Sequence, residues 1–201
     1  MVRGARGCLS RIQWFPSTNH RCVPMTRDRH PERVFFALWP PPAVRQQIAR
    51  EAAELPLASA KRRLAVQNLH MTLHFIGSLA VARIDCMVEQ ARDITCRPFT
   101  LDLDQMGYFA KPGVVWMGCS QAPSPLIDLH AQLANRLGGC GYVAEKRPFQ
   151  PHVTLARKVT RYRPTRCQPV AWSVDRFVLA RTVNQQGGVR YVPRNWFEFA
   201  G

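Results

Sequence analysis

Apolar residues follow two different periods along this chain, and the order of these periods predicts its secondary structure. Residues 34–39 form a short apolar run rich in aromatic side chains, which is typical of a buried strand and is stopped by Pro40–Pro42. A helix is expected next, because apolar residues recur on one helical face at Val44, Ile48, Ala52 and Leu55. Residues 68–77 then predict a second strand, which Gly77 closes.

The same order returns in the second half of the chain. Residues 114–118 predict a strand, and a helix follows over 125–137, with Ser124 as its N-cap, Pro125 at its first position and Gly138 just after its end. Residues 151–155 predict another strand. Each half therefore contains a β-α-β unit ending in the tetrapeptide His-x-Thr-Leu, which begins at position 70 in the first unit and at position 152 in the second.

Further elements complete the pattern. A helix is expected over 82–94 and a strand over 99–103, and strands at 176–179 and 190–192 flank the hairpin signal Gly187-Gly188. Strands and helices thus occur in two similar halves, which indicates an α+β or α/β pair of lobes. No low-complexity tract or linker divides the halves, so we expect residues 25–201 to form one bilobal domain.

The first 24 residues differ from the rest of the chain. They contain four arginines and no acidic residue, show no helical or strand period, and lack the apolar centre of a secretory signal. An Arg-rich leader of this kind suits a targeting peptide. We favour the interpretation that residues 1–24 are a disordered or spurious extension and that Met25 is the real start.

The charge of the chain favours a polyanionic partner. Its 201 residues include 28 Lys and Arg against 13 Asp and Glu, a formal charge of +15, and nucleic acid is the first candidate for such a surface. Of the 28 basic residues 24 are Arg, an excess that a GC-rich coding sequence would also produce, so charge alone does not establish the partner. No apolar run reaches the roughly 20 residues that span a bilayer, so no membrane partner is expected.

The seven cysteines indicate a reduced compartment. They are odd in number and never closer than ten residues, which excludes the common CxxC spacings of zinc and redox sites. The spacing also argues against a disulfide scaffold. We therefore expect a reduced, cytoplasmic protein.

The two His-x-Thr tetrapeptides predict a chemical site. Because side chains alternate between the faces of a strand, His70 and Thr72 share one face while Met71 faces the core. His152 and Thr154 form the matching pair in the second half. If a pseudo-twofold relates the halves, the two polar pairs face each other across a groove.

Such a groove suits metal-free cleavage of a phosphodiester. One neutral imidazole takes a proton from water while the other, charged, protonates the leaving oxygen, and two threonine hydroxyls donate to the phosphate. Neither strand places Asp, Glu or Cys beside its histidine, so we expect no metal and no other cofactor. The chain also lacks a Gly-x-Ser-x-Gly elbow and a Gly-rich phosphate loop, which argues against a serine hydrolase, a kinase or a dehydrogenase.

At these residues the chain resembles the two-histidine (2H) phosphoesterase superfamily, and most closely its RNA 2′,3′-cyclic phosphodiesterase branch, historically also called 2′-5′ RNA ligase. The similarity spans about residues 33–199 and is carried by five segments: 33–38, 68–77, 107–109, 114–118 and 147–157. The resemblance implies an α+β bilobal fold in which two antiparallel sheets line a central cleft and helices lie outside. It also implies hydrolysis of RNA 2′,3′-cyclic phosphate ends to 2′-phosphates.

The resemblance further implies the role of each site residue. His70 would protonate the departing 3′ oxygen and His152 would activate water, although the pseudo-symmetry leaves the reverse assignment open. Thr72 and Thr154 would bind phosphate oxygens, and Arg157 matches a position that contacts phosphate. Simple alternation puts Arg157 on the face opposite His152, so the strand must end or bulge before it.

Other histidines and aromatic residues receive simpler interpretations. Alternation puts His74 on the face of His70, which leaves a supporting role open, whereas His130 in the second helix is expected to be solvated. Three aromatic residues could stack on a terminal base: Phe36, Tyr108 and Trp116. Aromatic residues in strands more often belong to the core.

Two other functions remain open at this point. The same site could join RNA ends through a 2′-5′ bond, and a non-catalytic RNA-binding module could use the basic surface alone. The expected partners are RNA with 2′,3′-cyclic phosphate ends, such as tRNA fragments, or small cyclic nucleotides. We expect a monomer.

Overall fold

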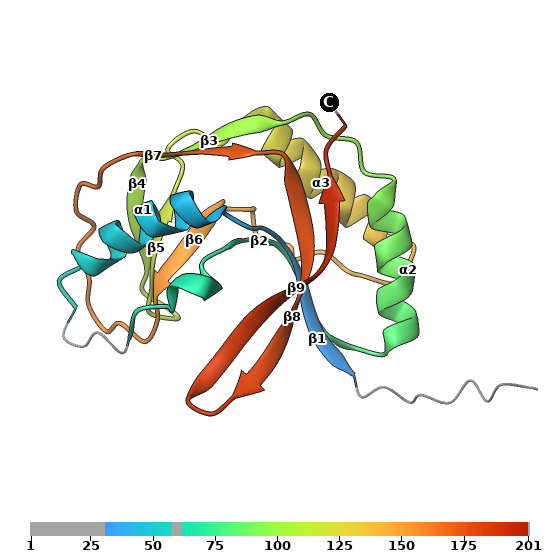
Figure 1. Cartoon of the computed structure of the whole chain (residues 1–201), viewed down its shortest axis with the longest axis horizontal. Coiled ribbons are helices and arrows are strands. Elements are labelled where there is room, and N and C mark those ends of the chain that lie inside the picture. Colours follow the sequence, from blue (N-terminus) through green and yellow to red (C-terminus); the bar gives the residue numbers. More distant parts are fainter. Residues whose placement is uncertain (1–30, 58–61, 201) are drawn as a thin grey trace, which may run out of the picture.

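The computed structural model describes residues 31–57 and 62–200, in which three α-helices accompany strands that form two antiparallel sheets (Figure 1). The strands are β1 (Glu32–Leu38), β2 (Met71–Leu79), β3 (Phe99–Leu103), β4 (Gln105–Phe109), β5 (Val114–Gly118), β6 (His152–Ala156), β7 (Val170–Val174), β8 (Arg176–Gln185) and β9 (Gly188–Glu198). The helices are α1 (Pro42–Ala53), α2 (Val81–Arg92) and α3 (Ser124–Gly138), with a short 3-10 helix η2 (Val66–Asn68). The predicted extension 1–24 and its proposed start at Met25 lie outside the described residues.

The larger sheet combines strands of both halves in the order β4-β5-β6-β2-β1-β8-β9, and β3 pairs with β7 in the smaller one. Within each repeat the two strands are antiparallel, β1 with β2 and β5 with β6, so neither unit is a parallel crossover. This pairing confirms the expected α+β class with two antiparallel sheets and decides against α/β.

The two lobes meet within the larger sheet at one residue pair. β2 and β6 are joined through Met71 and Val153, whereas β1–β2 and β5–β6 pair along most of their length. The side chains of Met71 and Val153 are fully buried in the main core. The hydrogen-bonded contact between the two lobes is therefore short, and it lies between the two His-x-Thr motifs.

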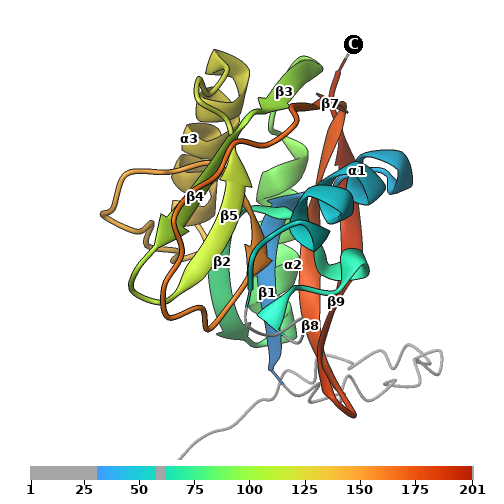
Figure 2. The same cartoon turned by 90° about the vertical axis from the view of Figure 1, so that its left-hand side faces the viewer.

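The helices of the repeat pack across the lobes. α1 follows β1 but contacts β6 and β7, while α3 follows β5 but contacts β2 and α2. Figures 1 and 2 show α1 apart from α2 and α3. Because each half supplies the helix that covers strands of the other, the two lobes share one core.

The sequence pattern predicted α3 well except at its ends. The predicted apolar stripe Leu126, Leu129, Leu133 and Leu137 is fully buried, and each such leucine stabilises the fold by about 1.5–3 kcal/mol. The N-cap is Pro123 rather than Ser124, and no side chain caps the helix. Gly138 is the last helical residue rather than the first after the helix. The ring of Pro123 restricts its φ angle, which suits the extended backbone at the N-cap position.

A second, smaller core lies on the other face of the large sheet. Its buried members are Phe35, Ala37, Trp39, Val178 and Ala180, and Tyr191 packs against them. These residues alternate with β1 and β8 residues of the main core, so the sheet is apolar on both faces at its centre.

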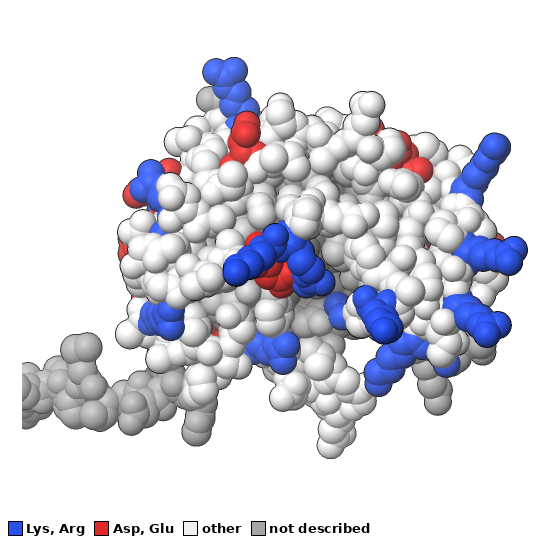
Figure 3. All heavy atoms as spheres, turned by 180° about the vertical axis from the view of Figure 1, so that it is seen from behind, with Lys and Arg blue, Asp and Glu red and all other residues white. Residues whose placement is uncertain are grey.

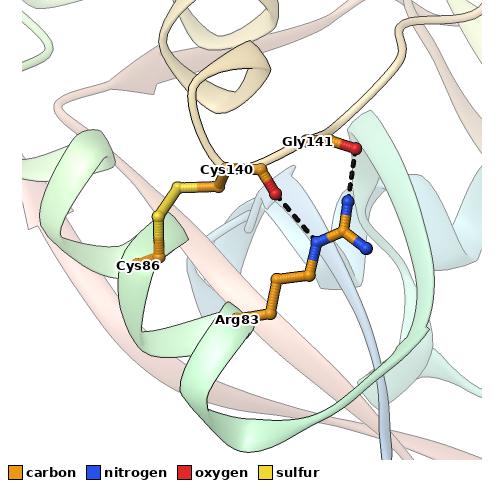
Figure 4. Close-up of a disulfide and its surroundings, with 4 residues drawn as sticks. All are labelled: Arg83, Cys86, Cys140 and Gly141. Carbon is orange, nitrogen blue, oxygen red and sulfur yellow. Dashed lines mark hydrogen bonds between the residues drawn. A yellow bond between two sulfur atoms is a disulfide. The ribbon is translucent and has the colours of Figure 1, made fainter.

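The cysteine interpretation needs a correction. Cys86 on α2 and Cys140, just after α3, form a disulfide, and Arg83 donates hydrogen bonds to the carbonyls of Cys140 and Gly141 (Figure 4). Spacing along the sequence did not reveal the pair because 54 residues separate its members and the fold brings the middle of α2 next to the end of α3. Cys96, Cys119 and Cys167 are free.

The surface of the described residues is basic, and no membrane-spanning helix occurs among them. Lys and Arg side chains are more widespread than Asp and Glu on the face shown in Figure 3.

No helix of the described part is both long and apolar enough to cross a bilayer.

Candidate active site

The two His-x-Thr motifs come together where β2 meets β6. Since Met71 and Val153 are paired in antiparallel register, Thr72 lies across from His152, and His70 lies across from Thr154. Both central residues point into the core, so the flanking polar residues point to the opposite face, as the alternation predicted. Each histidine thus faces the threonine of the other motif.

The two histidines are held in the same way. Nδ1 of His70 lies 2.6 Å from the carbonyl oxygen of Asn68, and Nδ1 of His152 lies 2.7 Å from that of Gln150. In a neutral imidazole, Nδ1–H donates to this carbonyl, which leaves the Nε2 lone pair free for chemistry. In His70 that Nε2 lies 3.1 Å from the Thr72 hydroxyl, which can donate to it.

An aromatic enclosure surrounds His70. The ring centroids of Phe35, Trp39 and Tyr191 lie 4.8, 5.6 and 5.0 Å from that of His70, and the histidine is 8% exposed. Burial lowers the pKa of His70 to about 4; the hydrogen bond to Asn68 opposes this, and the charges of Arg157 and His152 add to it. His70 and His152 lie on neighbouring strands, on either side of the Met71–Val153 pair.

His152 is less enclosed than His70. It is half-buried, beside the rings of Phe109 and Trp116 at centroid distances of 5.2 and 6.1 Å. Burial lowers its pKa, the hydrogen bond to Gln150 raises it, and the charge of Arg157 lowers it. The pseudo-symmetric motifs therefore place their histidines in unequal surroundings.

Arg157 reaches the site through an irregularity in β6. Opposite this strand Val115 pairs with Ala156 and Trp116 with Thr154, so Leu155 is an extra residue and the alternation shifts by one after Thr154. β6 ends at Ala156, and the exposed Arg157 follows. The sequence prediction required that the strand end or bulge before Arg157, and the structure shows both. The positive charge of Arg157 lowers the pKa of both histidines, although burial lowers each of them more.

A similar irregularity in β2 corrects the interpretation of His74. Ala37 pairs with Thr72 and Phe36 with His74, so Leu73 is an extra residue and His74 is turned to the face opposite Thr72. His74 is buried and its Nε2–H donates to the carbonyl of His130 at 2.8 Å. Simple alternation failed because it assumes a regular ladder.

His130 is not solvated as expected. Its ring is half-buried between those of His74 and Phe149, at centroid distances of 4.1 and 4.0 Å. Burial lowers its pKa to about 4, with a further contribution from His74, and burial also lowers the pKa of His74. The hydroxyl of Tyr142 lies 3.1 Å from Nδ1 of His74 and can donate to it.

The three aromatic residues considered for base stacking have different surroundings. Phe36 is fully buried in the main core, which excludes stacking on a ligand. The Tyr108 hydroxyl donates to the carbonyl of Val159 at 2.8 Å. Trp116 is 5% exposed and its ring fills the space where a side chain at Gly107 would lie. All three have structural roles.

A cleft of about 730 Å³ opens beside the motifs, and Thr72 and His152 are among the residues that line it. Its walls include Phe75, Phe109 and Phe149. In the described part of the chain no three His, Cys, Asp or Glu residues group in a way that could hold a metal ion. The arrangement therefore offers imidazoles, hydroxyls and a guanidinium to a ligand.

Sequence reasoning missed the residues that support the histidines. Asn68 ties His70 to β9, because its Nδ2 donates to the carbonyl of Val189 at 2.7 Å and its Oδ1 accepts from the amide of Tyr191 at 3.0 Å. A signal was present, since Asn68 and Gln150 both stand two residues before a motif histidine. The aromatic enclosure had no comparable signal, because Tyr191 comes from a distant strand.

Comparisons with known proteins identify the family of the chain. Residues 40–186 match the model of the 2′-5′ RNA ligase superfamily. The RNA 2′,3′-cyclic phosphodiesterase of Escherichia coli (strain K12) is 34% identical over 169 residues, which cover 83% of this chain and 96% of that protein. The protein of the same name from Thermus thermophilus is 26% identical over 182 residues, covering 84% and 91%.

Solved structures show the same fold. The crystal structure of E. coli LigT complexed with 3′-AMP matches with a TM-score of 0.79 and 32% identity, over 85% of this chain and 99% of that one. LigT complexed with phosphate matches with a TM-score of 0.74 and 30% identity, over 86% and 99%. By its motifs, its fold and these relatives, the chain belongs to the 2′-5′ RNA ligase superfamily.

Proposed function

We propose that the protein hydrolyses RNA 2′,3′-cyclic phosphate ends to 2′-phosphates, using His70 and His152 as an acid–base pair without a metal or other cofactor. The observation that carries this proposal is the pairing of Met71 with Val153, which brings both His-x-Thr motifs to one face of the sheet. The names of the relatives support the substrate class.

In the proposed reaction, water attacks the phosphorus of the cyclic phosphate and gives its proton to Nε2 of His152. The bond from phosphorus to the 3′ oxygen breaks, and His70 supplies the proton that makes this oxygen a hydroxyl. The phosphate stays on the 2′ oxygen. One proton passes from water to His152 and one passes from His70 to the 3′ oxygen, so the number of protons on the two histidines together does not change. Proton transfer of this kind contributes about 10²–10⁴-fold to the rate.

The unequal surroundings of the histidines support this division of roles. His152 is half-buried and lines the cleft, so water reaches it more readily than the enclosed His70. The pKa of His70 is lowered to about 4, which leaves it neutral in the free protein at pH 7. A bound phosphodiester carries a negative charge, which favours the imidazolium and raises the pKa of the adjacent histidine. His70 then takes up the proton it donates as substrate binds.

The remaining polar groups bind the phosphate. The Thr72 and Thr154 hydroxyls are on the same face as the imidazoles and can donate to the non-bridging oxygens, which hold the phosphorus in line with the attacking water. Arg157, whose charge acts on both histidines, matches the negative charge of the ring.

The test is replacement of each histidine. His70→Ala and His152→Ala are each expected to lower kcat on an oligonucleotide ending in a 2′,3′-cyclic phosphate by about 10²–10⁴-fold. Arg92→Ala, an exposed change on α2, is the control, and ³¹P NMR of the product identifies the phosphate position. Hydrolysis should persist in a chelator. Near-full activity in either histidine variant, or a 3′-phosphate product, would contradict the proposal.

The name of the matching superfamily favours one second reaction at the same site. An RNA 5′-hydroxyl can replace water, lose its proton to His152 and form a 2′-5′ linkage as the 3′ oxygen leaves. Rates of hydrolysis and joining on tRNA half-molecules distinguish the two. A non-catalytic RNA-binding role predicts instead that the protein turns over no substrate. It also predicts that salt-dependent RNA binding persists when both histidines are replaced.

The proposal also includes the setting in which the protein acts. The Cys86–Cys140 disulfide removes the argument from the cysteines for a reduced, cytoplasmic location, so the proposal names no compartment. We propose a monomer that acts on RNA fragments, such as cleaved tRNA, or on small cyclic nucleotides. Sedimentation of the purified chain tests the monomer, and relative rates on the two substrate classes test the preference.

A further inference from the structure

A second depression lies beside the active site, lined by residues from the start of α1 and from β9. It has a volume of about 300 Å³, and the residues that line it include Trp39, Arg45, Arg190, Tyr191 and Trp196. We call it the β9 groove. It shares no lining residue with the cleft beside His152.

The β9 groove is on the same face of the sheet as the motifs. Thr72 pairs with Ala37, Ala37 with Val178, and Val178 with Trp196, so these side chains share one face across four strands. With neighbouring strands about 4.8 Å apart, Trp196 lies about 14 Å from Thr72. The rings of Trp39 and Tyr191 line the groove and also pack on His70, so the groove is continuous with the wall of the active site.

The charge of the groove suits a polyanion. Three arginines and no acidic residue line it. Arg176 is paired with Asp175 and Glu198, whereas Arg45 and Arg190 form no ion pair with any described residue. The cleft beside His152 differs, because Glu145 lies in its wall and pairs with Arg147 at 2.7 Å.

The groove also presents an exposed aromatic ring with a cation beside it. Trp196 is 41% exposed, and the guanidinium of Arg176 lies 4.7 Å from its ring centroid. This cation–π contact stabilises the ring, and the exposed part of the ring is open to solvent. Nucleic-acid bases stack on such rings without regard to sequence, while arginines bind the phosphates between them.

We propose that the β9 groove binds the nucleotides on the 5′ side of the reacting RNA end, with a base on Trp196 and phosphates on Arg45 and Arg190. This inference rests on the proposed function, because only an RNA whose cyclic phosphate occupies the active site extends across the groove. The groove then favours single-stranded oligonucleotides over cyclic mononucleotides and reads no base sequence.

The test compares two substrates in the full-length protein: an oligoribonucleotide of about ten residues ending in a 2′,3′-cyclic phosphate, and 2′,3′-cyclic CMP. Trp196→Ala is expected to raise KM for the oligonucleotide about tenfold, with kcat unchanged. The double variant Arg45→Ala/Arg190→Ala is expected to raise the same KM and to reduce the slope of log KM against log salt by about two. Neither variant should change kcat/KM for cyclic CMP.

Two controls make the result specific. Arg181→Ala removes the same charge from β8, next to Ala180 and therefore on the opposite face of the sheet, and should leave both substrates unaffected. Trp196→Phe retains a ring and should restore most of the oligonucleotide affinity, which separates stacking from a folding defect. If Lys111→Ala/Arg147→Ala in the other cleft raises KM for the oligonucleotide instead, the RNA takes that path and the inference is wrong.

The outcomes separate this inference from the proposed function. Suppose that the wild type hydrolyses cyclic CMP and that the groove variants keep the wild-type KM for the oligonucleotide. The proposed role of the groove would then be wrong, and the proposed function would stand. If the wild type hydrolyses neither substrate, the proposed function is wrong. Fluorescence anisotropy with the same oligonucleotide then tests the groove directly, and equal affinity in wild type and variants would overturn it.

Discussion

Met71 on β2 and Val153 on β6 are paired, and this single pair determines the arrangement of the site. Each residue has a histidine on one side and a threonine on the other, so antiparallel pairing sets each histidine opposite the threonine of the other lobe. A shift of the pairing by one residue would turn the polar groups of one motif to the other face. Both central side chains are fully buried, which opposes such a shift.

Because each histidine lies opposite the threonine of the other lobe, we expect both threonines to contribute to activity. Thr72→Val and Thr154→Val keep the shape and the β-branching but remove the hydroxyl, so each should lower kcat/KM by about 10²-fold. Thr100→Val, an exposed change on β3, is the control. Steady-state kinetics on a cyclic-phosphate oligonucleotide measures the effect. If one variant retains wild-type kcat/KM, that threonine does not bind the transferring phosphate.

The repeat in the sequence was sufficient to predict most elements of the fold. Helical periods located the three α-helices, and the Gly187-Gly188 signal located the β8–β9 hairpin. β4 and β7 were missed, although the residues of β7 alternate between buried and exposed. Local patterns predict elements well where the apolar stripe is long, as in α3.

The irregularities and the distant pairings could not be predicted from the sequence. Extra residues at Leu73 and Leu155 shift the alternation, and they decide that His74 leaves the site face while Arg157 joins it. Such bulges set two residues of one strand against one residue of a partner strand elsewhere in the sequence, and the apolar pattern of a single strand does not show this. The Cys86–Cys140 pair likewise depends on how α2 and α3 pack.

Arg157 should add to the effect of burial in lowering the pKa of both motif histidines. Its positive charge disfavours the imidazolium, so Arg157→Gln should raise the pKa of His70 and of His152. NMR titration of the histidine ring protons measures both values. The same variant should lower kcat/KM by about 10–10²-fold, because it removes a charge-assisted hydrogen bond to phosphate.

The matched control for that change is Arg161→Gln, which removes the same charge from another exposed position of the segment after β6. It should leave the two pKa values nearly unchanged. Unaltered titration of His70 and His152 in Arg157→Gln would show that the guanidinium does not act on the site.

The buried His70 should make the protein less stable in acid. Its pKa is about 4 in the folded chain against 6.5 when exposed, so the unfolded state binds the proton first as the pH falls. The stability that His70 contributes is present above pH 6.5 and is lost as the pH falls toward 4. The loss between pH 7 and pH 4 is about 3 kcal/mol.

Urea unfolding at pH 7 and at pH 4 measures this effect. His70→Gln cannot titrate, so its free energy of unfolding should fall by about 3 kcal/mol less than that of the wild type over the same interval. Arg92→Ala serves as the control and should follow the wild type. A pH dependence in His70→Gln equal to that of the wild type would mean that His70 is not buried as a neutral ring.

The Cys86–Cys140 disulfide should stabilise the segment that leads to the active site. It closes a sequence separation of 54 residues and fixes the chain just after α3, from which the following residues run to Gln150 and His152. Cys86→Ser, or reduction, should lower the free energy of unfolding by about 2–4 kcal/mol. Cys119→Ser, at a free and half-buried cysteine, should have a smaller effect. Alkylation of the native protein followed by mass spectrometry identifies the bond, and modification of both Cys86 and Cys140 without reductant would show that the purified protein does not contain it.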